Sequence, residues 1–367
     1  MVLNIVLLIV GMILLVKGAD LFVGGSSRIA KAMKIPPLVI GLTLVSMGTS
    51  APEASVSMIG AVNGMNDLSV GNVVGSNIFN TLFILGVSGA IIPLAVGRDV
   101  RRFDIPAMLA VYAALLIFAF VITPLRIDIY ESVALIVAFA AYTAFLIVRA
   151  VRSNRSVAIK APPAESAQSA ASGAAQAKTD PTTDGTTLSA PPTIELAFAP
   201  NSAAGADRLE PSARKKRNIP LWLSVILTAV GLAGVIFGGD LVVDSASAIA
   251  KAAGMSEALV GLTIVAVGTS LPELVTSVVA AVKKESDIAV GNIIGSNIFN
   301  IAFILGMSSA ISAPVLNYSS LTDMLVMLGS GIMIFAAAVF IKSVARWQGI
   351  AMAAMYVGYL AYIIVRN

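Results

Sequence analysis

Two residue types are missing from this chain of 367 residues, which contains no cysteine and no histidine. The absence of cysteine excludes disulfide bonds and thiol nucleophiles. Without either residue the chain also lacks the usual protein ligands of zinc and haem, and imidazole acid–base catalysis is excluded. The chemistry of this chain therefore has to come from hydroxyl, amide, carboxylate and backbone groups.

Charged residues are also scarce. They make up 12% of the chain, against about 25% in a typical soluble domain, whereas hydrophobic residues make up 57%. The apolar residues come in runs of about 20, the length that crosses ~30 Å of hydrocarbon as a helix. We predict an all-α integral membrane protein with ten transmembrane helices at about 2–22, 37–60, 69–92, 103–122, 130–149, 219–242, 258–282, 288–312, 323–341 and 348–365.

Basic residues fall almost entirely on one side of this predicted arrangement. The first connecting loop and every second loop after it hold 20 of the 24 Lys and Arg residues. The opposite side holds Arg126, Lys251 and Arg366, and Lys17 lies inside the first segment. Because positive loops stay in the cytoplasm, we expect a multi-pass protein of the cell (inner) membrane with both termini outside.

The segment 150–218 separates two membrane regions, 1–149 and 219–367. It consists mainly of Ala, Ser, Thr, Pro, Gly and Gln. Such a composition buries too little apolar surface to offset its conformational entropy, so we interpret this segment as a disordered cytoplasmic linker. Its basic run 214–217 is an orientation signal or a binding site for anionic lipid head groups.

The two membrane regions contain an internal repeat. Residues 41–86 align without a gap to residues 261–306, at an offset of 220, with 26 identities in 46 positions. The same offset relates Gly18–Asp20 to Gly238–Asp240. Each half has five predicted helices, and an odd number places the halves in opposite orientations. An inverted-topology repeat of this kind is typical of secondary transporters, whose site lies near the membrane midplane.

Each half carries a glutamate within an apolar segment. Glu53 follows Gly48-Thr49-Ser50-Ala51-Pro52, and Glu273 follows Gly268-Thr269-Ser270-Leu271-Pro272. Glycine and proline loosen a helix and free its carbonyl groups. A charged side chain at this depth costs at least ~2.5 kcal/mol on insertion scales. The two glutamates are therefore our first candidates for functional residues.

Further oxygen donors lie on the third and eighth segments, where Ser76 and Asn80, and likewise Ser296 and Asn300, share a helix face. Oxygen donors select hard cations such as Ca²⁺, whereas transition metals prefer His or Cys. The two negative charges of the glutamates balance one divalent ion, or they are available to bind several Na⁺ ions. For the neighbouring Asn72, Asn77, Asn292 and Asn297, interhelical hydrogen bonding is the alternative to ion binding.

The doubled GTSxPE segment, each followed by GNxxGSNIFN, resembles the α-repeats of the calcium/cation antiporter superfamily, in its prokaryotic sodium/calcium exchanger-like branch. The resemblance covers the whole ten-helix plan except the linker. It implies an antiporter, not an enzyme, that exchanges Ca²⁺ for Na⁺ by alternating access and needs no cofactor. The expected partners are these transported ions and membrane lipid, with no nucleic acid and no obligatory protein partner.

The resemblance also implies an ion-binding set. Glu53 and Glu273 match the principal ligands of both ions, and Ser46 and Ala266 match backbone-carbonyl ligands of Na⁺. The first and sixth helices correspond to a sliding gate. The remaining matches are side-chain hydroxyls, carbonyls and amides at Thr49, Ser50, Thr269, Ser270, Ser76, Asn80, Ser296 and Asn300.

This sequence departs from some members of the superfamily in two places, and both bear on the reaction that we expect. Some relatives, including those that also move K⁺, have Asp where this chain has Asn300, so K⁺ coupling is disfavoured. The linker has no acidic cluster, so we expect no Ca²⁺-sensing domain. A Ca²⁺/H⁺ antiporter using the same glutamates remains an alternative. A cation channel is the alternative of another class, and the buried, liganded site argues against an open pore.

Overall fold

The structure is a computed structural model that describes residues 2–160, 220–254, 266–316 and 318–366, with the side chains of 153–160 and 266 left out. Residues 1–155 and 220–367 form one compact unit, and residues 156–219 form a second one. The predicted linker and the start of the predicted segment 258–282 therefore lie largely outside the described residues.

The described part of the chain is helical almost throughout, and several helices continue into one another through short π-helical turns (η). In the first half the elements are α1 (Val2–Met33), α2 (Pro37–Ile40), η1 (Gly41–Val45), α3 (Ser46–Thr49), α4 (Ala51–Val62), α5 (Asn66–Ile78), η2 (Phe79–Ile84), α6 (Leu85–Ile91), β1 (Leu94–Ala95), η3 (Val100–Asp104), α7 (Ile105–Ile117), η4 (Phe118–Ile122) and α8 (Ile129–Lys160). The short strand β1 pairs antiparallel with β2 in the second half.

The second half has a similar succession of helices, with its strand at a different place. Its elements are α10 (Leu221–Ala252), α12 (Ala266–Gly268), α13 (Leu271–Val282), α14 (Ser286–Ile298), η6 (Phe299–Leu305), α15 (Gly306–Ile311), α16 (Tyr318–Phe340), β2 (Ser343–Val344) and α17 (Arg346–Arg366). Among the described residues, eight helices are long and apolar enough to cross a membrane, and Pro37–Thr49 and Leu271–Val282 are shorter apolar helices. The prediction of an all-α membrane protein is confirmed.

The first helix differs from its predicted bounds. The hydrophobic pattern predicts an end near residue 22, with Arg28 and Lys31 in the following loop, but α1 continues to Met33 and includes both residues. One face of this extension is buried, at Ser26, Ser27, Ile29 and Ala30. Because that face packs inside the protein, the charged residues on the other face do not end the helix.

The helices differ strongly in burial. The helical span Ser286–Ile311 is the most buried and Asn66–Ile91 comes second, whereas α1, α8 and α17 expose many large apolar side chains. An apolar surface of that kind is suited to contact with lipid hydrocarbon. The polar segments of the two central spans are thus enclosed by apolar helices.

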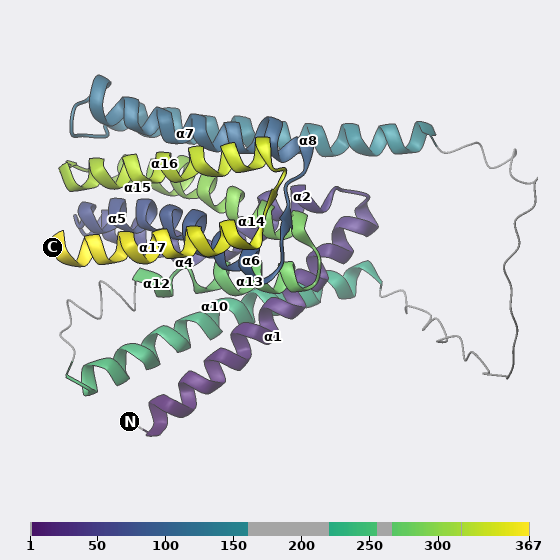
Figure 1. Ribbon diagram of the computed structural model, residues 1–367, viewed down its shortest axis with the longest axis horizontal. Coiled ribbons are helices and arrows are strands. Elements are labelled where there is room, and N and C mark those ends of the chain that lie inside the picture. Colours follow the sequence, from purple (N-terminus) through teal and green to yellow (C-terminus); the bar gives the residue numbers. More distant parts are fainter. Residues whose placement is uncertain (1, 161–219, 255–265, 317, 367) are drawn as a thin grey trace, which may run out of the picture. The chain divides into compact units, whose positions relative to one another are not determined.

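Helices α1 and α10 lie next to each other (Figure 1). They pack closely along a series of glycines. A Cβ atom built on Gly18 would meet the backbone of Gly234 at 2.7 Å, and one built on Gly238 would meet Leu15 N at 2.6 Å. Asp20, in the middle part of α1, forms an ion pair at 2.8 Å with Lys283, which directly follows α13.

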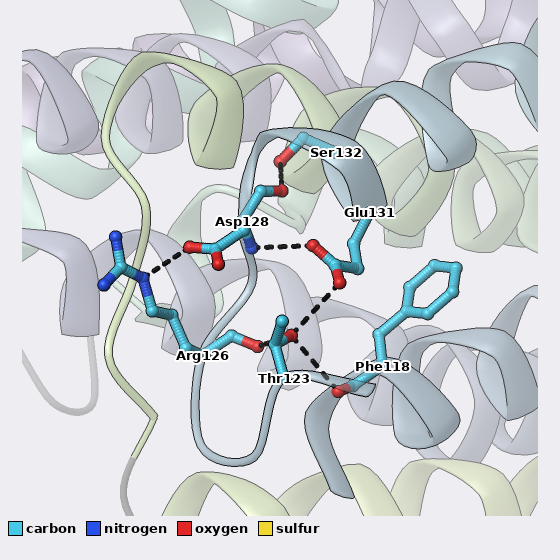
Figure 2. A network of polar contacts seen from close by, with 6 residues as sticks. All are labelled: Phe118, Thr123, Arg126, Asp128, Glu131 and Ser132. Carbon is cyan, nitrogen blue, oxygen red and sulfur yellow. Dashed lines mark hydrogen bonds and ion pairs between the residues drawn. The ribbon is translucent and has the colours of Figure 1, made fainter. Parts of the chain in front are cut away.

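Helix α8 begins with hydrogen bonds between side chains and the backbone (Figure 2). Glu131 Oε2 accepts from the backbone N–H of Asp128 at 3.0 Å, and Glu131 Oε1 accepts from Thr123 Oγ1 at 3.3 Å. A glutamate three positions into a helix satisfies the otherwise unpaired N–H at its start. Helix α17 begins in the same way, because Gln348 Oε1 accepts from Ala345 N at 2.8 Å.

Candidate functional site

Both glutamates lie in the first turn of a helix that restarts after a break. Helix α3 ends at Thr49, Ser50 has φ −80° and ψ 11°, and α4 begins at Ala51 with a proline in its first turn. The second half repeats the break at Ser270, with φ −91° and ψ 7°, before α13. A proline cannot donate to the preceding turn, and the positive end of each new helix favours a nearby carboxylate.

Each glutamate is held by a serine of the other half. Ser50 Oγ donates to Glu273 Oε1 at 2.7 Å, and Ser270 Oγ donates to Glu53 Oε1 at 2.8 Å. Both glutamates are fully buried. The second oxygen of each, Oε2, has no hydrogen-bond partner among the described residues. The two breaks therefore bring both carboxylates into one region and leave each with a free acceptor.

Two buried amides provide further unpaired oxygens. Asn80 Nδ2 donates to Asn297 Oδ1 at 3.3 Å, and Asn300 Nδ2 donates to Asn77 Oδ1 at 3.1 Å. The Oδ1 atoms of Asn80 and Asn300 have no partner within the part of the chain that the structure describes. The nitrogen ends of these amides are thus occupied, and their oxygen ends are available.

The other predicted site residues also contact the opposite half. Their contacts are Ser76 Oγ with Ser270 Oγ at 3.2 Å, Ser296 Oγ with Ser46 O at 3.4 Å, Thr49 Oγ1 with Asn292 Oδ1 at 3.2 Å, and Thr269 Oγ1 with Asn72 Oδ1 at 3.5 Å. Ala266 is the first residue of α12. Apart from Ala266, whose side chain lies outside the description, the predicted residues come together across the two halves.

Sequence reasoning missed the residues that support this set. Asn72 Nδ2 donates to Ser57 Oγ and Asn292 Nδ2 to Ser277 Oγ, both at 2.9 Å. Both serines are identical across the repeat, a signal that would have found them. Thr81, which accepts from Asn297 Nδ2 at 2.9 Å, gave no such signal because its counterpart is Ile301.

No basic side chain among the described residues neutralises the charge of the site. None of the ion pairs among the described residues involves Glu53 or Glu273. The site thus contains two buried carboxylates. Four of its side-chain oxygens are unpaired, one from each glutamate and one each from Asn80 and Asn300. An uncompensated buried charge is strongly unfavourable, and a hard cation coordinated by oxygen atoms is the partner that such a donor set suits.

A cavity of about 490 Å³ leads to this region. It is lined by Asn72, Ser76 and Thr269 of the site and by Asp67, Asp323 and Arg366 farther away. The equivalent surface of the second half is closely packed, because a Cβ atom on Gly291 would meet Leu38 O at 2.9 Å and one on Gly295 would meet Ser46 Oγ at 2.7 Å. Among the described residues, the site therefore has a cavity beside the first-half segment and close packing at the equivalent surface of the second half.

The comparisons with known proteins agree with one another. The family described as "Sodium/calcium exchanger protein" matches residues 3–148 and 223–365. Inner membrane protein YrbG of Escherichia coli is 34% identical over 85% of this chain and 81% of its own length. Sodium/calcium exchanger MaX1 of Methanosarcina acetivorans is 30% identical over 97% of each chain.

A solved structure shows the same likeness in three dimensions. The sodium-calcium exchanger NCX_Mj, studied in a work on extracellular ion exchange and binding-site occlusion, has a TM-score of 0.73 and 28% identity, with 99% of both chains covered. The family match spans most of this chain and includes both glutamates and both asparagines with unpaired oxygens. This chain belongs to the sodium/calcium exchanger family.

Proposed function

We propose that this protein is an antiporter that exchanges Ca²⁺ for Na⁺ across the membrane by alternating access. The observation that carries the proposal is the set of unpaired, fully buried oxygens, Glu53 Oε2, Glu273 Oε2, Asn80 Oδ1 and Asn300 Oδ1. One Ca²⁺ would neutralise both carboxylates, and Ca²⁺ tolerates irregular sets of oxygen ligands. The names of two similar proteins, sodium/calcium exchanger MaX1 and sodium-calcium exchanger NCX_Mj, support the same pair of ions.

The complete proposed ligand set follows the contacts between the halves. Glu53 and Glu273 bind both ions, and the other ligands are Thr49, Ser50, Thr269, Ser270, Ser46, Ala266, Ser76, Asn80, Ser296 and Asn300. Ser50 and Ser270 orient one oxygen of each glutamate and leave the other for an ion. Asn300 contributes a neutral oxygen, which keeps the site at two negative charges and disfavours an additional K⁺.

We further propose that ten helices form two inverted five-helix repeats, 1–149 and 219–367. The reciprocal bonds of Ser50 with Glu273 and of Ser270 with Glu53 support this arrangement, since a twofold relation between the halves produces such pairs. By the distribution of basic residues, both termini lie outside and the linker 150–218 lies in the cytoplasm. The cavity would then open to the outside, with the cytoplasmic side closed.

The test is ion transport in everted membrane vesicles. With a protonophore present, an imposed Na⁺ gradient should drive ⁴⁵Ca²⁺ uptake, and the double variant Glu53→Gln, Glu273→Gln should abolish it because no charge remains to balance the ion. Uptake that follows a proton gradient and not a Na⁺ gradient would replace Na⁺ with H⁺ as the coupling ion. Ca²⁺ flux that never exceeds its electrochemical equilibrium would identify a channel and overturn the exchange reaction.

A further inference from the structure

Two ion pairs and a hydrogen bond join helix α1 to the turn between α13 and α14. Lys283 Nζ lies 2.8 Å from Asp20 Oδ1, and Lys31 Nζ lies 3.1 Å from Glu285 Oε1. Ser27 Oγ donates to the same oxygen of Glu285 at 2.6 Å. The turn thus contacts α1 at three residues through charged side chains.

The equivalent turn of the first half, between α4 and α5, lacks these charges. At the offset of 220 that relates the two halves, Lys283 corresponds to Asn63 and Glu285 corresponds to Met65. Neither an asparagine nor a methionine can form an ion pair. The same contact is therefore not available to the first half.

Helix α10, in contrast, keeps the three residue types that α1 uses, as Asp240, Ser247 and Lys251. Among the described residues Asp240 forms no ion pair, and the buried Ser247 Oγ has no hydrogen-bond partner. The two halves thus differ in this contact because their turns differ, whereas their helices carry the same side chains.

The packing of the two helices differs in the same direction. Helix α1 packs along α13, whereas α10 makes little contact with the equivalent helix α4. If the protein alternates between two states, the inverted repeat implies that the halves exchange their conformations in the state open to the other side. Such an exchange would move α1 away from the turn between α13 and α14 and would break both ion pairs.

We propose that Lys283 and Glu285 form an ionic latch that holds α1, keeps the cytoplasmic side closed and favours the state open to the outside. The proposal rests on the proposed function, because it takes the protein to alternate between two states with the predicted sidedness. Both ion pairs are partly exposed, and such pairs contribute little each. A weak contact suits a latch that has to open in every transport cycle.

The experiment measures how often the site opens to each side, through two single cysteines in this cysteine-free chain. Val56 lines the cavity, and Thr276, its equivalent at the offset of 220, is fully buried. A membrane-impermeant maleimide should label Val56→Cys in intact cells. It should label Thr276→Cys in everted vesicles only while the cytoplasmic side is open. Ca²⁺ on both sides lets the loaded protein pass between its states.

Loss of the latch should increase labelling from the cytoplasm. In the Thr276→Cys background, Lys283→Gln together with Glu285→Gln should raise the labelling rate in everted vesicles about threefold to thirtyfold, the combined effect of two partly exposed ion pairs on the population of the open state. Lys284→Gln is the matched control, because Lys284 belongs to the same turn but forms no ion pair among the described residues. Its labelling rate should equal that of the wild type. Thermal unfolding checks that each variant is folded.

A transplant of the charges tests the latch by gain of function. Asn63→Lys together with Met65→Glu places the latch charges opposite α10, which should stabilise the state closed to the outside. The labelling rate of Thr276→Cys in everted vesicles should therefore rise, and that of Val56→Cys in intact cells should not.

A labelling rate that neither loss nor transplant of the charges changes would overturn the proposal, as would an equal rise in Lys284→Gln. Uptake of ⁴⁵Ca²⁺ that follows a proton gradient and not a Na⁺ gradient would overturn the Na⁺ coupling alone. The labelling would still decide the role of Lys283 and Glu285, because it reports on the two states and not on the coupling ion.

Discussion

Glu53 and Glu273 each divide their two oxygens between the protein and the site. One oxygen accepts from a serine of the opposite half at 2.7 or 2.8 Å, and the other has no partner among the described residues. The serine fixes the direction of the carboxylate without neutralising its charge. The charge therefore stays available to an ion, and each glutamate should contribute through electrostatics and not through packing alone.

The first prediction concerns this charge. Glu53→Gln or Glu273→Gln removes one of two charges, and a charge pair at ~4 Å is worth about 4 kcal/mol at an effective dielectric near 20. Part of this free energy is recovered, because the ion-free site of the variant no longer holds two carboxylates that repel each other. We expect a net loss of about 2–4 kcal/mol, which weakens the interaction with Ca²⁺ ~30- to 1,000-fold.

The measurement is Na⁺-driven ⁴⁵Ca²⁺ uptake in proteoliposomes, normalised to folded protein. Glutamate-to-aspartate variants keep the charge and should lose less of this uptake than the glutamine variants. Asn80→Ala and Asn300→Ala remove only a neutral oxygen ligand. Their loss of uptake should be smaller than that of the aspartate variants. Wild-type transport by Glu273→Gln together with no transport by Asn300→Ala would show that the ion binds elsewhere.

At the scale of elements, glycines determine how closely α1 and α10 approach. Gly11, Gly18 and Gly25 are seven residues apart on α1, and Gly231 and Gly238 are seven apart on α10. A Cβ atom on Gly18 would meet Gly231 O at 2.8 Å, and one on Gly11 would meet Gly238 O at 3.0 Å. Small residues let membrane helices pack backbone to backbone, so these two helices form one closely packed pair.

The second prediction adds a single methyl group to this contact. In Gly231→Ala the new Cβ would meet Phe22 N and would lie 2.8 Å from Gly18 O, so α1 and α10 have to separate. Overpacking of this kind typically costs about 1–3 kcal/mol. We expect a lower unfolding temperature and slower Na⁺/Ca²⁺ exchange, measured by thermal unfolding in detergent and by vesicle uptake.

Gly358→Ala is the matched control for that change. Gly358 lies in α17, and a Cβ atom there would have nothing within 4 Å among the described residues. The unfolding temperature of this control should equal or exceed that of the wild type, because alanine is the better helix former. Equal behaviour of the two variants would mean that the contact between α1 and α10 is not close in the membrane.

For the whole molecule, similar side-chain contacts occur in the two halves, several of them outside the motif segments. Tyr142 and Arg149 of α8 bind Asp104 at 3.2 and 3.1 Å, and Tyr359 and Arg366 of α17 bind Asp323 at 2.9 and 2.8 Å. The aromatic contacts of Phe79, Phe83 and Tyr356 correspond in the same way to those of Phe299, Phe303 and Phe139. These pairs support the proposed twofold relation over the complete halves.

The third prediction tests the proposed orientation in the membrane. The chain has no cysteine, so single cysteines introduced by Ser166→Cys and Ser320→Cys report on their own positions. The first should react with a membrane-impermeant maleimide only in everted vesicles, and the second only in intact cells. Labelling of both from the outside of intact cells would overturn the inverted arrangement and the sidedness derived from basic residues.

The sequence alone was sufficient to identify the membrane class, the repeat within the sequence, and the two glutamates as candidate site residues. Runs of about 20 apolar residues have few stable environments other than a bilayer, and 26 identities at one offset establish a repeat without coordinates. Glu53 and Glu273 stood out because a carboxylate in hydrocarbon is costly. Such inferences depend on residue types and local spacing, which a sequence displays directly.

Only the tertiary structure separated the roles of the asparagines. Asn77 and Asn80 lie on the same short segment, yet Asn80 keeps an unpaired oxygen and Asn77 supports Asn300. Their partners come from positions more than 200 residues away, so no local pattern identifies them. Thr81 was invisible for the same reason, and the extension of α1 to Met33 was missed because a buried face, not hydrophobicity along the chain, holds that end helical.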